Sequence, residues 1–434
     1  MDRRIFLGGL LTACGGDGGD ALASEYGDDD GTRGDTSPPR PSGSGKSRVI
    51  VVGGGMAGAT VAKYLRLWGD GIDVTLVERS AAYTSNILSS LVLTGQRSLD
   101  SLVFGYDRLR ANYGIDVVAG DVVAIDPVGV KVTLAGERTL AADRIVLAPG
   151  IDFDAVPGLG DSDRMPHAWK AGAQTTLLAR QLQAMPAGGT VLLTVPKTPY
   201  RCPPGPYERA GLLADWLRVN KPRSKLLVLD ANPEVTAEKD NFMHAFSSLY
   251  GGVIEYHPST DVLQADPAGM NLVTSNGRYH GDVINLIPRH RAGTLLATAG
   301  LNNATEDRFG AVDVLSYAST VAGAGKVHVI GDASATTQPK AGHIANQEAK
   351  VCADAISRLL TGGQPDPAPV TNSSCYSTIT MKQAAWLHAV YQYDATKRAM
   401  VTVPAATGAS DGWNSDDFED MHTWFRALVA DSFA

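Results

Sequence analysis

A glycine-rich loop between a strand and a helix is the feature that most constrains the fold of this 434-residue chain. Residues 48–52 form a run that is apolar after Arg48 and typical of a buried strand, and Gly53-Gly54-Gly55-Met56-Ala57-Gly58 follows it. The next residues repeat apolar side chains at the spacing of one helix face, and a second strand over 73–77 ends at Glu78. This order of strand, glycine loop, helix, strand and acidic residue is that of a dinucleotide-binding unit.

Each glycine of the loop has a separate physical task in such a unit. Gly53 makes the tight turn, Gly55 lets the backbone approach a pyrophosphate, and Gly58 allows the helix to pack closely on the strand. The free N–H groups at the start of the helix favour the phosphates. Glu78 lies 20 residues after Gly58 and is expected to accept hydrogen bonds from the adenosine ribose. We therefore predict a bound dinucleotide.

Two later segments favour FAD over NAD as that dinucleotide. Residues 144–150 form a strand that runs into a turn at Gly150, and residues 326–332 form a strand that ends in Gly331-Asp332. In flavoproteins with two dinucleotide-type domains, an aspartate in this position meets the ribityl chain of the flavin. The predicted fold class is α/β, with two Rossmann-like dinucleotide-binding domains and a small C-terminal α+β domain.

The second Rossmann-like domain is predicted to lack a nicotinamide site. The FAD-binding domain comprises residues 47–165 and 280–365, and the second domain, over 166–279, lies between these segments. Its first strand is followed by residues 197–208, which contain four prolines where an NAD(P)H site would need a glycine-rich loop. Proline removes backbone donors and stiffens the chain, so this loop is not a phosphate cradle.

The C-terminal domain is expected over residues 366–434. Its segment 420–429 has a helical pattern, with Trp424, Phe425, Leu428 and Val429 near one face. This pattern fits a helix of the core, and it also fits a helix that contacts a membrane or a partner protein.

The first 46 residues are predicted to be a targeting signal and a linker. Residues 1–14 contain Arg3 and Arg4 before an apolar stretch, which resembles a twin-arginine export signal. The stretch ends at Cys14 in a sequence similar to a lipobox, so the chain is either a lipid-anchored protein or one with a plain export signal. Residues 15–46 are polar and rich in glycine, and we expect them to be disordered. The predicted localisation is periplasmic.

Composition excludes several other classes of function. The net charge of −8 argues against nucleic-acid binding, which needs a basic face. No apolar run approaches the ~20 residues of a membrane-spanning helix. The four cysteines show no spacing for zinc and no Cys-x-x-Cys-His motif for covalent haem, so no metal site is predicted.

Two of these cysteines, Cys202 and Cys375, carry the candidate chemistry. Cys14 belongs to the processing site, and Cys352 is expected to be a buried residue of a helix. In an exported chain, a disulfide is the default state of the two that remain. Such a disulfide is either a structural link between domains or a redox-active pair.

From Ser47 to its end, the sequence resembles the flavoprotein subunit of flavocytochrome c sulfide dehydrogenase, within the FAD-dependent pyridine nucleotide-disulfide oxidoreductases. The motifs that carry the resemblance lie at residues 51–55, 166–172, 201–209, 282–288, 329–333, 339–342 and 375–377. The cysteine–proline motif of residues 201–209 is the most specific of them. The resemblance implies a glutathione reductase-like arrangement of the two Rossmann-like domains.

The resemblance also assigns candidate roles to residues. It implies a redox-active disulfide of Cys202 and Cys375 beside the flavin, with Glu208 as a candidate base. A carboxylate at the start of a helix, favoured by the helix dipole, is the alternative interpretation of Glu208. Family members often attach FAD through a cysteine in a Tyr-Thr-Cys segment. Here Asn86 takes that place in the segment 83–90, and we predict non-covalent FAD.

The predicted function is an FAD-dependent sulfide dehydrogenase. Sulfide would attack the disulfide, and electrons would pass through FAD to a c-type cytochrome, either a subunit or a soluble protein. A sulfide:quinone reductase and a non-catalytic flavin-binding protein are the alternatives.

Overall fold

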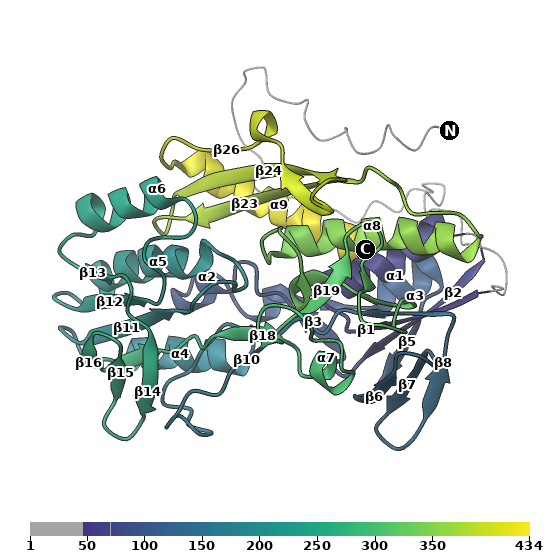
Figure 1. Ribbon diagram of the computed structural model, residues 1–434. Coiled ribbons are helices and arrows are strands. Elements are labelled where there is room, and N and C mark those ends of the chain that lie inside the picture. Colours follow the sequence, from purple (N-terminus) through teal and green to yellow (C-terminus); the bar gives the residue numbers. More distant parts are fainter. Residues whose placement is uncertain (1–46, 70) are drawn as a thin grey trace, which may run out of the picture. The chain divides into compact units, whose positions relative to one another are not determined.

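The computed structural model describes residues 47–69 and 71–434 (Figure 1). The predicted signal at 1–14, with Cys14, and the linker at 15–46 lie outside the described residues.

A mainly parallel sheet is built around the glycine loop. Its strands, in spatial order, are β22 (Ser334–Ala335), β19 (Gly310–Asp313), β20 (Ala318–Ser319), β21 (Val327–Val329), β9 (Arg144–Leu147), β1 (Ser47–Val52), β2 (Ile72–Glu78) and β5 (Asp116–Ala119). β1 pairs in parallel with both β2 and β9. Because such a sheet is covered on both faces, Val49–Val52 are all buried, which explains the unbroken apolar run in the sequence.

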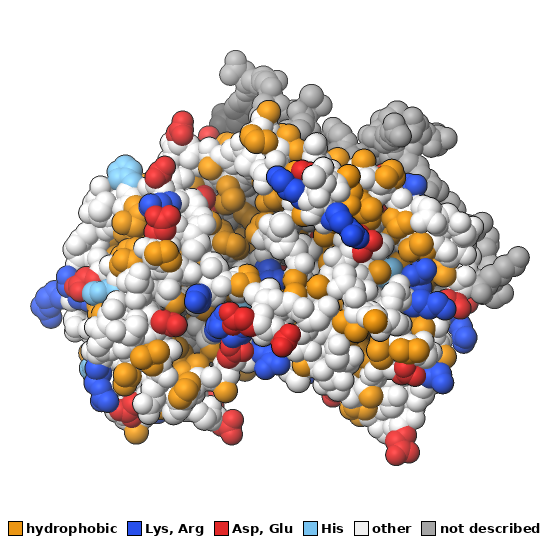
Figure 2. All heavy atoms as spheres, viewed as in Figure 1, with side chains coloured by type: hydrophobic (Ala, Val, Ile, Leu, Met, Phe, Trp, Pro, Cys, Tyr) orange, Lys and Arg blue, Asp and Glu red, His pale blue; other side chains and the backbone are white. Residues whose placement is uncertain are grey.

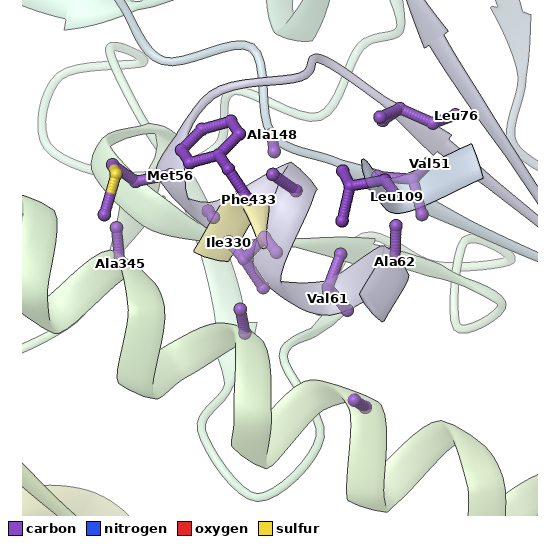
Figure 3. Packing of buried hydrophobic residues seen from close by; sticks show 14 of the residues in the cluster. Val51, Met56, Val61, Ala62, Leu76, Leu109, Ala148, Ile330, Ala345 and Phe433 are labelled. Atoms are coloured by element: carbon purple, nitrogen blue, oxygen red, sulfur yellow. The ribbon is translucent and has the colours of Figure 1, made fainter. Parts of the chain in front are cut away.

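Helices α1 (Met56–Trp68) and α8 (Gly342–Leu360) pack against each other beside this sheet (Figure 1). Buried residues of both helices belong to one core cluster, in which Ala345 of α8 lies near Met56 at the start of α1 (Figure 3). Cys352 lies in α8 and is fully buried, as the sequence predicted. The seven-residue helix α3 (Asp107–Tyr113) adds Leu109 to the same core.

A second parallel sheet forms the centre of the next domain. Its order is β13 (Ile254–His257), β12 (Lys225–Asp230), β11 (Thr190–Val195) and β17 (Val283–Asn285). Helices α4 (Ala173–Ala184) and α5 (Gly205–Asn220) belong to this unit. The expected end of the second domain, at residue 279, falls just before β17. Because β17 pairs with β11, it belongs to the parallel sheet of the second domain. The domain limits as a whole stay a prediction.

Both Rossmann-like units carry a small antiparallel meander. In the first it consists of β6 (Val122–Asp126), β7 (Lys131–Leu134) and β8 (Thr139–Ala141), and in the second of β14 (Val262–Asp266), β15 (Asn271–Thr274) and β16 (Gly277–His280). The repeated plan of parallel sheet and meander supports two domains of one type.

The C-terminal part combines an antiparallel sheet with one long helix. The strands are β23 (Val370–Thr378), β24 (Ala384–Asp394), β25 (Ala399–Thr402) and β26 (Gly408–Ala409), and helix α9 (Ser415–Phe433) follows them. Asn414 caps α9 by accepting a hydrogen bond from the N–H of Asp417 at 2.8 Å. Phe425, Leu428 and Val429 are buried, so the predicted segment 420–429 is a helix of the core.

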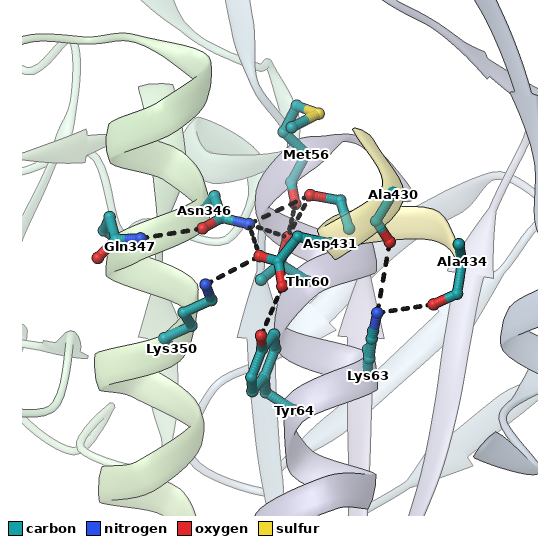
Figure 4. Close-up of polar contacts among 11 residues, drawn as sticks. Met56, Thr60, Lys63, Tyr64, Asn346, Gln347, Lys350, Ala430, Asp431 and Ala434 are labelled. Atoms are coloured by element: carbon teal, nitrogen blue, oxygen red, sulfur yellow. Dashed lines mark hydrogen bonds and ion pairs between the residues drawn. The ribbon is translucent and has the colours of Figure 1, made fainter. Parts of the chain in front are cut away.

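The last turn of α9 is held against α1 and α8 by a polar cluster (Figure 4). Asp431 accepts hydrogen bonds from Tyr64 at 2.6 Å and Asn346 at 2.7 Å, and it pairs with Lys350 at 2.8 Å. Next to it, the ring of Phe433 stacks on Tyr83, with centroids 5.2 Å apart. The end of the chain thus packs against the helix that follows the glycine loop.

The remaining elements are short. They are β3 (Ala82–Thr84), α2 (Ser90–Leu93), β4 (Val103–Gly105), β10 (Ile151–Phe153), α6 (Lys239–His244), a π-helical turn (Ala245–Leu249), β18 (His290–Ala292), α7 (Leu295–Thr298), and 3₁₀ turns at Asp100–Leu102, Gly331–Ala333 and Pro404–Ala406. Among the residues that the structure describes, no helix has both the length and the apolar character that a bilayer crossing requires.

Candidate active site

One pocket brings together residues from all three parts of the fold, and we call it the main pocket. The surface is hollowed below the β23–β24 sheet, where hydrophobic side chains gather (Figure 2). Of the residues selected from the sequence, those that line the main pocket are Gly55, Asn86, Gly150, Cys202, Glu208, Gly331, Asp332 and Cys375. Gly53, Gly58 and Glu78 lie behind its wall and are not among its lining residues.

The glycine loop has the geometry that a bound dinucleotide requires. A β-carbon at Gly58 would lie 1.7 Å from the carbonyl oxygen of Gly53, and one at Gly53 would lie 2.3 Å from the carbonyl oxygen of Ala148. Both positions therefore need glycine for packing. Gly55 differs, because the nearest atom to a β-carbon there is 3.7 Å away, on Tyr83. Its backbone faces the main pocket, as the approach to a pyrophosphate demands.

Glu78 braces this loop from the end of β2. Its Oε2 accepts a hydrogen bond from the N–H of Gly54 at 2.7 Å, and its Oε1 accepts one from Ser80 at 2.9 Å. The carboxylate thus stands beside the glycine loop. Its contact with an adenosine ribose stays a prediction.

The other end of the main pocket offers an unsatisfied carboxylate. Within the described residues, Asp332 Oδ1 is buried and has no hydrogen-bond partner. Its Oδ2 lies 3.8 Å from the guanidinium of Arg201. Burial raises the pKa of Asp332, although Arg201 and Lys340 oppose the effect. A buried polar atom of this kind calls for a ligand hydroxyl, which the ribityl chain of FAD supplies. The residues present therefore fit FAD at both ends.

Asn86 and Gly150 complete the wall on the side of the first sheet. Asn86 Oδ1 accepts a hydrogen bond from the N–H of Ala171 at 2.7 Å, which links this segment to the second domain. Gly150 has φ of +66°, a backbone conformation that glycine adopts without strain. Asn86 lines the main pocket, whereas the third position of the Tyr-Thr-Cys pattern falls on Ser85. Neither residue can form a thioether, and non-covalent binding stays a prediction.

The loop before α5 fixes the position of Cys202. The N–H of Cys202 donates to the carbonyl of Lys340 at 2.7 Å, and its own carbonyl accepts from Gly205 at 2.9 Å. A β-carbon at Gly205 would lie 2.9 Å from Cys202 Sγ and 2.9 Å from the ring of Trp169. Glycine is therefore required for close packing at this position of the cysteine–proline motif. Cys202 itself has φ of +59°, which is unusual for a residue with a side chain.

Cys375 reaches the same pocket from the middle of β23. The structure has no bond between Cys202 and Cys375 among its described residues, and their disulfide stays a prediction. Burial raises the pKa of Cys375 to about 12 and that of Cys202 well above its usual value. Each thiol therefore needs a proton acceptor nearby before it can act as a thiolate.

Glu208 is the candidate acceptor for the thiols, because its charge raises the pKa of both Cys202 and Cys375. It lies in the first turn of α5, and its Oε1 accepts a hydrogen bond from the hydroxyl of Thr378 at 3.0 Å. Burial raises the pKa of Glu208 to about 7. A carboxylate placed only to complement the helix dipole would have a lowered pKa. The pKa of Glu208 is raised instead, which favours a role for Glu208 as an acid or base near neutral pH.

Two charged residues of the site escaped the sequence analysis. Burial raises the pKa of Glu238, just before α6, to about 7, and its Oε2 accepts a hydrogen bond from Ser377. Arg209 lines the main pocket, where its guanidinium stacks 4.5 Å from the centre of the Trp169 ring. The motif at residues 201–209 contained a signal for Arg209. For Glu238 the sequence contained none.

Comparison with known proteins places the chain in a class and then in a family. Residues 47–183 match the pyridine nucleotide-disulphide oxidoreductase family. Residues 175–288 match the central domain of the sulfide dehydrogenase [flavocytochrome c] flavoprotein chain, and residues 367–433 match the flavin-binding domain of flavocytochrome c sulphide dehydrogenase. The protein is therefore a flavin-dependent oxidoreductase of the pyridine nucleotide-disulfide class, and its cofactor is FAD. Within that class, it belongs to the flavocytochrome c sulfide dehydrogenase flavoproteins.

Individual relatives agree with this placement. The sulfide dehydrogenase flavoprotein chain of Chlorobaculum thiosulfatiphilum is 50% identical over 48 residues, which are 11% of this chain and 100% of that sequence. The probable ferredoxin reductase CtmF of Castellaniella defragrans is 38% identical over 106 residues, 24% of this chain and 26% of that protein. This chain thus spans about a quarter of the length of that relative and of the apoptosis-inducing factor homolog A of Dictyostelium discoideum, of which it covers 24%.

Solved structures confirm the predicted fold class. The sulfide:quinone oxidoreductase of Aquifex aeolicus superposes with a TM-score of 0.74 at 16% identity, over 89% of this chain and 91% of that one. The putidaredoxin reductase–putidaredoxin complex gives a TM-score of 0.61 at 18% identity, over 80% and 82% of the two chains. At these identities the likeness concerns the fold alone.

Proposed function

We propose that this protein oxidises sulfide at the Cys202–Cys375 pair, beside bound FAD. One observation carries the proposal: the two thiols and Glu208 line the same pocket as the residues that fit the flavin. Membership of the flavocytochrome c sulfide dehydrogenase family supports this substrate.

The first step is thiol–disulfide exchange at the oxidised pair. Hydrosulfide attacks one of the two sulfurs, so that a new S–S bond forms and the bond between the cysteines breaks. One cysteine becomes a persulfide, and the other leaves as a thiolate. The sulfur of hydrosulfide is thereby oxidised, and the sulfur that leaves is reduced. When bound, FAD supplies a two-electron acceptor for this chemistry and single electrons for an outside acceptor.

The side chains of the site manage the charge and the proton of this step. Near neutral pH, Glu208 can take the proton of dissolved H₂S or of a thiol, because its pKa is raised to about 7. The guanidinium of Arg209 lies in the same pocket and stabilises the anionic sulfur species. Both cysteines are half-buried in the pocket, which limits the access of water to the persulfide.

We further propose that the electron acceptor is a c-type cytochrome, either a subunit or a soluble protein. The sequence of this chain has no motif for covalent haem, and the family is that of a flavocytochrome. Export by the twin-arginine route to the periplasm, with a lipid anchor at Cys14, is the matching proposal for localisation. A quinone is the alternative acceptor.

An anaerobic titration of the oxidised holoprotein tests the proposal. Sulfide should bleach the flavin absorbance, and cytochrome c should restore it. Restoration by a quinone alone would favour the quinone reductase, and no bleaching would leave only a flavin-binding role. Cys375→Ser should retain FAD and lose the bleaching. The matched control is Cys352→Ala, because Cys352 is buried in α8 outside the main pocket.

A further inference from the structure

A second hollow, which we call the outer cleft, lies between the second domain and the C-terminal sheet. It is lined by residues 238–241 and His244 on one side and by residues 409–413 on the other. Asn241 bridges the two sides, because its amide donates to the carbonyl of Ser410 at 3.1 Å and accepts from the N–H of Gly412 at 3.0 Å. The outer cleft is therefore a fixed part of the contact between the second domain and the C-terminal sheet.

Glu238 connects the outer cleft with the interior. The residue lines the cleft, while its carboxylate is directed inward, where Oε2 accepts a hydrogen bond from the Ser377 hydroxyl. Within the described residues, the buried Oε1 has no hydrogen-bond partner. The backbone of Glu238 has φ of +50°, a conformation that costs free energy for any residue with a side chain. An unpaired buried carboxylate oxygen on a strained backbone is expensive, and function is the usual reason for retaining one.

The two thiols have different carboxylate neighbours. Among the charged groups around Cys202, Glu208 affects its pKa most, whereas Glu238 has the largest effect around Cys375. Ser377, which holds Glu238, lies two residues after Cys375 and so on the same face of β23. Glu208 lines the main pocket, and Glu238 lines the outer cleft.

We propose that Glu238 transfers protons between the Cys375 thiol and water in the outer cleft, while Glu208 serves Cys202; this inference rests on the proposed function. The thiol of Cys375 gives its proton to the Glu238 carboxylate and becomes a thiolate. The protonated Glu238 then gives the proton to water in the cleft, and no electrons move in either step. Such a route is needed because sulfide oxidation releases protons inside a buried pocket.

The charged groups around Glu238 agree with this direction of transfer. On the inner side it faces Cys375 on β23 and Glu208 on α5, whose negative charge favours a protonated Glu238. On the outer side the cleft holds Lys239, Asp240, His244 and Asp411. Lys239 pairs with the exposed Glu234 at 2.5 Å, so its charge is already matched by another carboxylate. The pKa of about 7 for Glu238 suits a group that gains and loses a proton near neutrality.

The test compares Glu238→Gln with the matched control Glu234→Gln in the FAD-loaded protein. Two quantities are measured from pH 6 to pH 10: the rate of flavin bleaching by sulfide, and the rate at which iodoacetamide alkylates Cys375 in the reduced protein, read by peptide mass spectrometry. Because Glu238→Gln removes a negative charge, Cys375 should be alkylated several-fold faster at pH 8. Bleaching near pH 7 should be at least 10-fold slower, and Glu238→Asp should recover part of it.

The outcomes separate this inference from the proposed function. Unchanged alkylation of Cys375, or an unchanged pH profile of bleaching, in Glu238→Gln would overturn the role of Glu238. No bleaching of the unmodified protein would instead refute the proposed function. If Glu238→Gln does not retain FAD, Ser377→Ala tests the same route, because it releases the carboxylate without removing it. A bleaching rate equal to that of the unmodified protein would then overturn the inference.

Discussion

Replacement of Glu208 by glutamine should make the protein more stable at alkaline pH while it impairs sulfide oxidation. Glutamine has the shape of glutamate, and its Oε1 can still accept the hydrogen bond that Thr378 donates at 3.0 Å. The variant therefore removes the charge and the titration while leaving the packing in place. If Glu208 were retained for stability, its replacement by glutamine would instead make the protein less stable.

The size of the effect follows from the pKa of Glu208. Burial raises it from 4.5 to about 7, and a difference of one pH unit is worth ~1.4 kcal/mol. The unfolded chain loses this proton from about pH 4.5 upward, whereas the folded protein retains it until about pH 7. The contribution of the protonated carboxyl is thus fully present below pH 4.5 and is lost as the pH rises through 7. The loss amounts to about 3 kcal/mol at pH 8.5.

Thermal unfolding of the FAD-loaded protein at pH 5 and pH 8.5 checks this reasoning. The midpoint of Glu208→Gln should exceed that of the unmodified protein by a few degrees at pH 8.5 and differ little at pH 5. Bleaching by sulfide at pH 7 should be about 100-fold slower or more, as expected for the loss of a general base. An equal shift of the midpoint at both pH values would refute the raised pKa, and an unchanged bleaching rate would refute the role as a base.

Three further predictions concern the retention of FAD. Gly58→Ala should abolish FAD binding, because its β-carbon would lie 1.7 Å from the Gly53 carbonyl oxygen; full flavin absorbance after desalting would contradict this. Asp431→Asn should lower the temperature of FAD release, followed by flavin fluorescence, because losing the charge-assisted pair with Lys350 costs about 2 kcal/mol; an unchanged release temperature would disprove the role of the cluster. Acid precipitation should leave all flavin in the supernatant, since the segment 83–90 has no cysteine that could form the thioether, and yellow protein in the pellet would refute non-covalent binding.

Features with a local physical cause could be predicted from the sequence. Residues 225–230 contain an apolar run that predicts a strand, and β12 has these bounds, because a parallel strand buried on both faces is nearly continuous in apolar residues. Residues 197–208 are predicted to form a loop, but helix α5 begins within this segment, at Gly205. Pro204 and Pro206 had indicated a loop, but proline in the first turn costs no hydrogen bond and sets φ for a helix. The prolines that indicate a loop in the sequence thus lie in the first turn of helix α5.

Contacts between distant segments could not be predicted in this way. Glu238 meets Ser377 across 139 residues, and neither lies in a motif that indicates the contact. Its raised pKa arises from burial between the second domain and β23, a property of the assembled fold. The residues alone likewise did not show that Cys202 and Cys375 lie close together. Their pairing was inferred from the resemblance to a family. The structure brings them to one pocket because their loop and strand meet there.

Because the segment around Asn86 has no cysteine for a thioether, the last turn of α9 is expected to help retain FAD in addition to packing. Without a thioether, FAD must be retained by the walls of the main pocket alone. One of these walls includes Tyr83, and its ring is held by stacking on Phe433 at 5.2 Å. Asp431 anchors Phe433 to α1 and α8, the two helices that flank the glycine loop and Gly331. The C-terminal domain therefore supplies both the second thiol and the part that closes the FAD site, so loss of its last turn should weaken FAD binding before it affects the thiols.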